Sequence, residues 1–431
     1  MGVTGVVGWY YLLLTVYLLV PATTLRFGST APAVLVMWLC YAAFRLGALP
    51  PSRQPGGGTA FAQRLPSWLS GGRKVVLLAA VCLCSYLVAR FYTGQTIGTT
   101  VDALLHGESL YRQYQAYFRQ NRLDAFSFGK VPFILMAALV KFALISGFVS
   151  LVALKARPKL SEWAFLLALA LPYLYYSITR GTSLELFELF ALIVFCLAER
   201  SVAHGRALLA GKARLGVGLL AVLCALAFSR GVAIRGDLHG SITREIRYDP
   251  AAFLSRVAPG LAALSFNLVG YFGFGFYYTS VAVRQIWLRS FRSFLAGLVP
   301  GGFNLVGVQD FTREICGSKI DCGVAWIPDS ARLLNSVGFL GLLSLCFLLG
   351  LLLRFAQARR VGGTAVIAET IAFMIFMEMI SLPVGNLLVV SSPNVVIIGL
   401  LTLASIPSFA RIATRLLRGF AKLVGTGLRA V

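Results

Sequence analysis

Charged residues are scarce in this sequence, and carboxylates are the scarcest of them. Only 13% of the 431 residues are charged, whereas 58% are hydrophobic. A soluble globule of this length would have too little polar surface to stay dissolved. The composition therefore excludes a soluble protein and indicates one membrane domain.

The sequence also lacks a recognisable leader and an internal repeat. Residues 1–8 contain no basic segment, and no small-residue cleavage site follows the apolar run to Val20. We therefore expect this run to remain as a first transmembrane helix. The missing repeat argues against a secondary transporter, because such proteins commonly contain two related halves.

Apolar runs of roughly 20 residues recur along the chain, each long enough as a helix to cross a hydrocarbon core of ~30 Å. Ten of them predict transmembrane helices, near residues 5–22, 31–49, 75–92, 132–154, 162–179, 184–198, 215–229, 332–353, 363–382 and 386–407. Residues 251–308 are apolar but broken by Gly and Pro, and hold either two further spans or a re-entrant element. We predict an all-α polytopic integral membrane protein, with a bundle of about 10–12 transmembrane helices over residues 1–410.

The formal net charge of +23 raises the question of nucleic-acid binding. Most Lys and Arg, however, fall in alternate short loops between apolar runs, which is the pattern that orients membrane helices. This pattern places both termini in the cytoplasm, and residues 411–431 form a basic amphipathic tail suited to anionic lipid. We therefore expect membrane lipid as a partner, no nucleic acid, and a multi-pass protein of a bacterial cytoplasmic (inner) membrane.

The cysteines support the same topology. Six of the eight lie in apolar runs, where a thiol is usually a small hydrophobic side chain. Cys316 and Cys322 lie instead in a polar loop on the extracytoplasmic side, close enough in sequence to form a small disulfide ring in an oxidising compartment. A metal site needs more ligands than this pair offers, so we expect no metal.

Arginines mark two extracytoplasmic segments. Arg180 and Gly181 form a turn that leads into a helix with Glu185 and Glu188 on one face. Arg180 either forms an ion pair that fixes packing or binds an anionic phosphate group beside the helix N-terminus. The second segment lies within a candidate catalytic region at residues 229–331 and holds four arginines on a side of the membrane where basic residues are normally scarce: Arg230, Arg235, Arg244 and Arg247. These arginines suit either lipid headgroups or a lipid-linked diphosphate.

The same region contains aromatic and acidic candidates. Tyr271, Tyr277 and Tyr278 belong to a run in which Gly alternates with aromatic residues, which is typical of close helix packing and would also suit stacking on sugar rings. A transfer onto a sugar hydroxyl needs a general base. The carboxylates at this membrane edge that could take the proton are Asp310, Asp321 and Asp329.

Three of these segments together resemble the bacterial oligosaccharide repeat-unit polymerases, the O-antigen polymerase-like family. The Arg180–Gly181 turn resembles that family's Arg-Gly turn, and residues 270–283 resemble its Gly-Tyr-Tyr-Gly segment, with Phe272 in place of the second Tyr. The segment AWIPDSARLLNSVGFLG resembles its Trp and Asp segment before a late membrane helix. The resemblance implies a GT-C-like helical bundle, and it favours ten spans with residues 251–308 largely outside the membrane.

The activity that the resemblance implies is glycosyl transfer from one polyprenyl-diphosphate-linked oligosaccharide to the end sugar of another. Arg180, with Arg230 or Arg235, would stabilise the departing diphosphate. Cleavage of the bond to the lipid diphosphate would supply the driving force, so neither a nucleotide sugar nor a cofactor would be needed. The sequence agrees with this, because no cytoplasmic loop is long enough for a nucleotide-binding domain. A flippase and a chain-length regulator are the protein partners that the resemblance implies.

Two other functions fit the same outline. An O-antigen ligase uses the same donor chemistry, but is expected to carry a histidine in a large external loop, where this chain offers His106 and His239. A transporter of polysaccharide or lipid-linked sugar would also fit many spans with both ends inside. Ionisable residues within the apolar runs, which such a transporter would need, are few, mainly Lys141, Glu369 and Glu378.

Overall fold

The computed structural model describes residues 2–19, 23–49, 72–121, 123, 127–155, 158–203, 218–219, 221–226, 228, 246–297, 302–318, 327–358, 365–385 and 391–405. These residues contain no β-strand and only two isolated bridges, Thr23 to Tyr248 and Leu288 to Gly338. The all-α prediction is confirmed for this part of the chain. The elements are α1 (Val3–Leu19), α2 (Phe27–Ala48), α3 (Arg73–Thr93), α4 (Ile97–Leu105), α5 (Leu110–Gln120), η2 (Phe128–Lys130), α6 (Val131–Phe148), η3 (Val149–Ala153), α7 (Leu160–Arg180), α8 (Leu184–Ala203), α10 (Phe253–Val257), α11 (Pro259–Val283), α12 (Phe291–Gly297), α13 (Gly302–Val306), α14 (Phe311–Ser318), α15 (Asp329–Ala358), α16 (Ala365–Ser381) and α17 (Ser392–Ser405).

Four helical segments in the described residues are long and apolar enough to cross a membrane: Phe27–Ala48, Arg73–Thr93, Phe128–Ala153 and Asp329–Ala358. Val3–Leu19 and Ser392–Leu401 are shorter apolar helices. Every predicted span overlaps residues that are helical in the structure, and for 215–229 these are 218–219, 221–226 and 228. An unbroken apolar run forms a helix because a helix satisfies its backbone polar groups internally. The count of 10–12 spans and their orientation stay predictions, and the tail at 411–431 lies outside the described residues.

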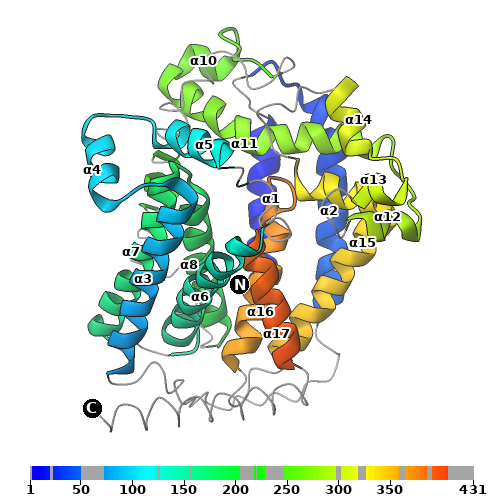
Figure 1. Cartoon of the computed structure of the whole chain (residues 1–431). Helices are drawn as coiled ribbons and strands as arrows, with labels where there is room; N and C mark the ends of the chain where they lie inside the picture. The colour runs from blue at the N-terminus through cyan, green and yellow to red at the C-terminus, as the bar shows by residue number, and fades with distance from the viewer. Residues whose placement is uncertain are drawn as a thin grey trace.

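The described part of residues 251–308 contains one long helix, α11, and three short ones, α10, α12 and α13. Figure 1 shows α11 lying across the upper end of the bundle, with α10 above it and α12, α13 and α14 to one side. α11 packs against α2, α14 and α15. In the described part of this segment α11 thus covers one end of the bundle, and the choice between two further spans and a re-entrant element stays a prediction.

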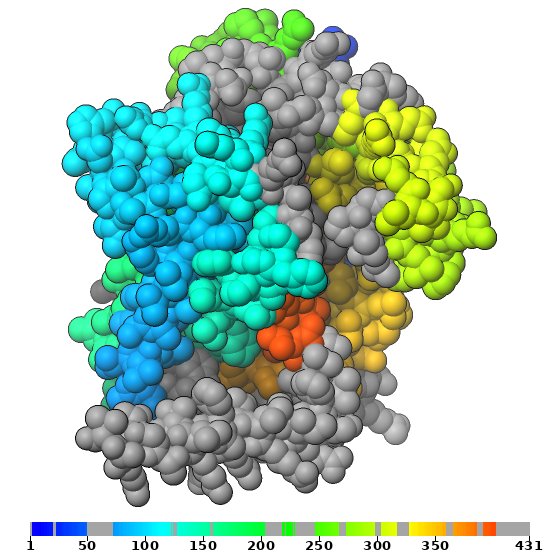
Figure 2. All heavy atoms as spheres, in the orientation of Figure 1, coloured from blue at the N-terminus to red at the C-terminus, as the bar shows by residue number. Residues whose placement is uncertain are grey.

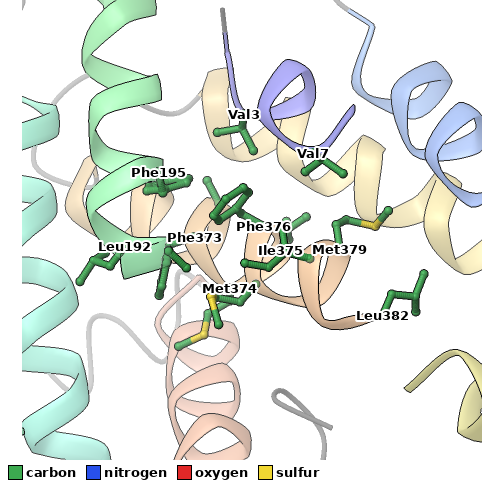
Figure 3. Packing of buried hydrophobic residues seen from close by; sticks show 14 of the residues in the cluster. Val3, Val7, Leu192, Phe195, Phe373, Met374, Ile375, Phe376, Met379 and Leu382 are labelled. Carbon is green, nitrogen blue, oxygen red and sulfur yellow. The ribbon is translucent and has the colours of Figure 1, made fainter. Parts of the chain in front are cut away.

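The interior is formed where α1, α8 and α16 meet. Figure 3 shows Val3 and Val7 of α1 facing Phe373 and Phe376 of α16, with Phe195 of α8 beside them. All five side chains are buried. The ring centroids of Phe195 and Phe373 are 5.4 Å apart and steeply tilted, an arrangement favoured between aromatic rings.

Two glycines set the distance between α2 and α15. A Cβ added at Gly47 would lie 2.2 Å from the carbonyl oxygen of Phe347, and one added at Gly350 would lie 2.1 Å from that of Phe44. The helices therefore approach each other backbone to backbone at these points. Small residues allow such close contact between membrane helices, where packing replaces the hydrophobic effect as the main attraction.

We expect Gly47→Val to lower the free energy of unfolding by about 1–3 kcal/mol, because α2 would have to move away from α15. The matched control is Gly28→Val on the same helix, where an added Cβ meets nothing within 4 Å. Thermal unfolding in detergent measures both. Equal melting temperatures for the two variants would show that the α2–α15 contact is not close-packed.

Candidate functional site

Helix α7 ends at Arg180 because the next residue, Gly181, adopts a left-handed conformation with φ of 58°. The N–H groups of Gly181 and Thr182 donate to the carbonyls of Ile178 and Ser177, which is the usual way a glycine closes a helix. A Cβ at Gly181 would lie 2.5 Å from the backbone nitrogen of Tyr111. Gly181 is thus required both by its backbone conformation and by the approach of α5.

The Arg180 guanidinium is held between an ion pair and two aromatic rings. Its Nη1 lies 2.8 Å from Oε1 of Glu185, and the two side chains are 17% and 4% exposed. The guanidinium carbon lies 4.8 Å from the ring centroid of Tyr176 and 5.6 Å from that of Tyr114. Nε is buried and has no hydrogen-bond partner among the described residues. The structure therefore contains the ion pair that the sequence allowed, with one donor of the guanidinium still unused.

Helix α5 covers this guanidinium with the ring of Tyr114. Its first turn is capped by Ser109, whose hydroxyl accepts from the N–H of Arg112. α5 packs against α3 and α7. Burial raises the pKa of Tyr114, and the charge of Arg180 partly opposes this rise. Tyr114 thus stays protonated at neutral pH, with its ring over Arg180.

A second ion pair lies deeper in the same group of helices. Lys141 Nζ of α6 is 2.5 Å from Oε1 of Glu188 on α8, and both side chains are buried. The Tyr173 hydroxyl of α7 donates to Oε2 of the same glutamate. The sequence indicated Lys141 as an ionisable residue in an apolar run and Glu188 as part of the helix face after the Arg180 turn, but not that the two pair. Ion pairing satisfies both charges where water is excluded.

Asp310 lies in a different cluster, at the start of α14. Its Oδ1 accepts from the N–H groups of Thr312 at 3.1 Å and Arg313 at 3.3 Å, from the Thr312 hydroxyl at 2.5 Å, and from Asn335 Nδ2 at 2.9 Å. This is the geometry of a helix N-cap. Asp310, which the sequence offered as a catalytic base, is thus engaged in beginning α14 and joining it to α15.

Arg289 and Asn335 complete this cluster, and sequence reasoning missed both. Arg289 donates through Nε to the Asn335 carbonyl at 2.7 Å and through Nη2 to Asn335 Oδ1 at 2.8 Å. Its guanidinium carbon lies 4.6 Å from the Phe311 ring centroid. Burial lowers the pKa of Arg289, and Asp310 opposes that shift. The local sequence offers no signal for its role, because Arg289 is one of three arginines in residues 284–292.

Capping predicts how Asp310 responds to substitution. We expect Asp310→Ala to cost about 1 kcal/mol of stability through loss of the cap, and Asp310→Ser to restore most of it, because serine also caps helices. Both variants should keep their activity per folded molecule. Thermal unfolding measures the first effect, and an assay of the glycosyl transfer that the sequence predicts measures the second. A serine variant that is stable but inactive would instead identify Asp310 as the base.

Tyr278 and Asp329 are buried rather than facing a site. The Tyr278 hydroxyl donates to the Thr312 carbonyl at 2.9 Å and lies 3.4 Å from Cys316 Sγ. Asp329 is 2% exposed at the start of α15, where the Ser381 hydroxyl lies 3.5 Å from Oδ2. This burial argues against a sugar contact at Tyr278 and against Asp329 as a base that reaches substrate. The sequence alone does not show whether an aromatic residue or a carboxylate at the membrane edge faces the protein interior or a substrate.

The remaining predicted residues are only partly described. Arg247 has an exposed side chain, and its backbone pairs with Thr24, whereas Tyr277 of α11 is half-buried. Cys316 is disulfide-bonded, as expected, although its predicted partner Cys322 is outside the described residues. Also outside them are Arg230, Arg235, Arg244, Asp321 and the side chain of Tyr271.

The two clusters share one end of the bundle. Figure 1 shows α5, which covers Arg180, and α14, which begins after Asp310, both in the upper part of the molecule. Among the described residues no hydrogen bond or ion pair joins the clusters. The same part of the chain holds no group of three or more His, Cys, Asp or Glu that could bind a metal ion. Arg180 and its neighbours are thus the best-supported candidate site, and they suit an anion.

No family model, curated protein or solved structure matches this chain.

Proposed function

We propose that this chain is a membrane glycosyltransferase that polymerises polyprenyl-diphosphate-linked oligosaccharide repeat units on the extracytoplasmic side of the membrane. The observation that carries the proposal is the Arg180 guanidinium, held at the end of α7 with an unused Nε donor. An ion pair with Glu185 and the two tyrosines hold it. A guanidinium presents its donors as a planar fork that matches a phosphate group.

The proposed reaction uses this arginine at the leaving group. The bond between the anomeric carbon and the diphosphate breaks, and its electron pair leaves on the diphosphate, where Arg180 stabilises the developing charge. The acceptor hydroxyl oxygen forms the new bond to that carbon, and its proton passes to a base. Asp321 is the remaining candidate for the base, since Asp310 caps α14 and Asp329 is buried.

Reconstitution tests this function and separates it from its alternatives. Purified protein in vesicles is given a short lipid-diphosphate-linked oligosaccharide, and the products are separated on a gel. A ladder of lengthening chains on the lipid supports a polymerase, whereas transfer to an added lipid core and not to a second repeat unit indicates a ligase. If neither product forms while the folded protein is present, the proposed function is wrong.

Transport of a lipid-linked sugar is a second candidate, because the few ionisable residues in the apolar runs are buried inside the bundle. Glu188, Glu369, Glu378 and Lys141 are all buried within helices of the bundle. Ionisable residues inside a membrane protein often mark an ion or substrate pathway. Counterflow uptake of the labelled oligosaccharide lipid into protein-containing vesicles, with no new glycosidic bond, would favour this candidate.

A further inference from the structure

The segment between α11 and α14 has an exposed surface of aromatic, aliphatic and arginine side chains. Phe291 is 71% exposed and Leu305 is 80% exposed, and Trp287 is also exposed. Arg284 and Arg292, both exposed, flank these residues. Figure 2 shows α12 to α14 standing out from one side of the molecule. We call residues 284–297 and 302–306 the side platform.

The structure of α15 sets a level against which the platform can be placed. Its helix is broken at Gly338, where φ is 72° and ψ is 179°. The part that follows, from residue 339 to Ala358, is about 30 Å long at about 1.5 Å per residue, which matches the thickness of a hydrocarbon core. Taking residues 339–358 as the part of α15 that crosses the membrane places Gly338 at the level where α15 leaves the hydrocarbon core.

The side platform is attached to α15 at this level. The N–H of Phe339 donates to the carbonyl of Trp287 at 3.0 Å, and Leu288 forms a bridge with Gly338. The rings of Trp287 and Phe339 are 5.1 Å apart. Two residues before the break, α15 also touches α12: a Cβ added at Gly297 would lie 2.2 Å from the Ser336 hydroxyl oxygen. With α15 placed in this way, the platform lies at the boundary between hydrocarbon and headgroups.

We propose that the side platform is an interfacial element that inserts Phe291 and Leu305 into one lipid monolayer, while Arg284 and Arg292 bind the phosphate groups of anionic phospholipids. An exposed tryptophan and apolar residues between arginines are the composition that this boundary favours. Each arginine near an anionic surface contributes about 1 kcal/mol of binding. The platform anchors the cluster of Arg289, Asn335 and Asp310 at headgroup level. This inference does not depend on the proposed glycosyl transfer.

Spin labels test the insertion. Single cysteines are introduced at Phe291 and Leu305 in a full-length chain whose six free thiols have been replaced, and the protein is reconstituted in phosphatidylcholine and phosphatidylglycerol vesicles. Collisions with molecular oxygen report lipid, and collisions with a polar nickel chelate report water. We expect oxygen collisions to dominate at both positions.

Two further spin-label positions serve as references for lipid and water and show that the protein is folded. Leu348, exposed on the spanning part of α15, should report lipid, and Ala251, exposed next to α10, should report water. If Leu305 and Phe291 behave like Ala251, or become shielded only when another membrane protein is added, the proposal is overturned.

The arginines are tested by lipid retention. Arg292→Gln should weaken phosphatidylglycerol binding by roughly fivefold, the equivalent of about 1 kcal/mol, as measured by native mass spectrometry in detergent. The control is Arg256→Gln, which removes an exposed arginine of α10 and should leave retention unchanged. Equal retention in the two variants would contradict the headgroup contact.

Discussion

Arg180→Lys should lower the rate of chain growth on the order of 100-fold, the effect of losing one preorganised donor at a developing charge. Lysine keeps the positive charge beside Glu185, so the buried carboxylate is not left unpaired. It loses the planar fork and the stacking between Tyr176 and Tyr114. The rate is measured by following ladder growth in vesicles at saturating lipid-linked donor.

The control for this loss is Arg119→Gln, which removes an exposed arginine from the end of α5. Its rate should equal that of the native chain, because Arg119 makes no contact with the Arg180 cluster in the described structure. An Arg180→Lys variant that folds and elongates chains at the native rate would place the leaving-group site elsewhere.

Lys141→Met should cause the largest loss of stability, about 3–5 kcal/mol, because it leaves Glu188 buried without its cation. The two atoms that pair are 2.5 Å apart, and both side chains are buried between α6 and α8. Unfolding by increasing SDS in mixed micelles measures the change in the free energy of unfolding.

The double variant Lys141→Met with Glu188→Gln removes both charges and keeps a hydrogen-bond acceptor for Tyr173. It should recover most of the lost stability, since a buried ion pair contributes little beyond its own desolvation cost. If the double variant is as unstable as Lys141→Met alone, the loss comes from packing around the lysine stem and not from the unpaired charge.

Much of the helical layout could be predicted from the sequence because each span is encoded locally. An apolar run of sufficient length forms a helix in lipid whatever its neighbours are, and the spans near α2, α3, α6 and α15 follow this rule. The Arg180–Gly181 turn could also be predicted, since a glycine after a helix favours the left-handed closing conformation.

The orientation of α11 could not be predicted in this way. Its 25 residues are as apolar as a span, and only its packing against α2 and α15 decides that it lies across the end of the bundle (Figure 1). The burial of Tyr278 follows from the same packing. Composition indicates an aromatic strip, but not the neighbour that covers it.

Contacts between distant segments were the other part that sequence reasoning missed. Arg289 and Asn335 are 46 residues apart, and their hydrogen bonds exist only because the platform returns to α15 at Gly338. Nothing in either local sequence specifies this partner. The role of Asp310 as a helix cap likewise depends on where α14 begins, which its short, mixed sequence does not define.

Binding of a lipid diphosphate tests the central proposal most directly. Native protein in nanodiscs is titrated with a polyprenyl diphosphate and with the matching monophosphate, beside Arg180→Lys and Glu185→Gln. The native chain should prefer the diphosphate, Arg180→Lys should lose that preference, and Glu185→Gln should strengthen it by removing a competing carboxylate 2.8 Å from the guanidinium. An Arg180→Lys protein that binds the diphosphate as tightly as the native chain would contradict the role of Arg180.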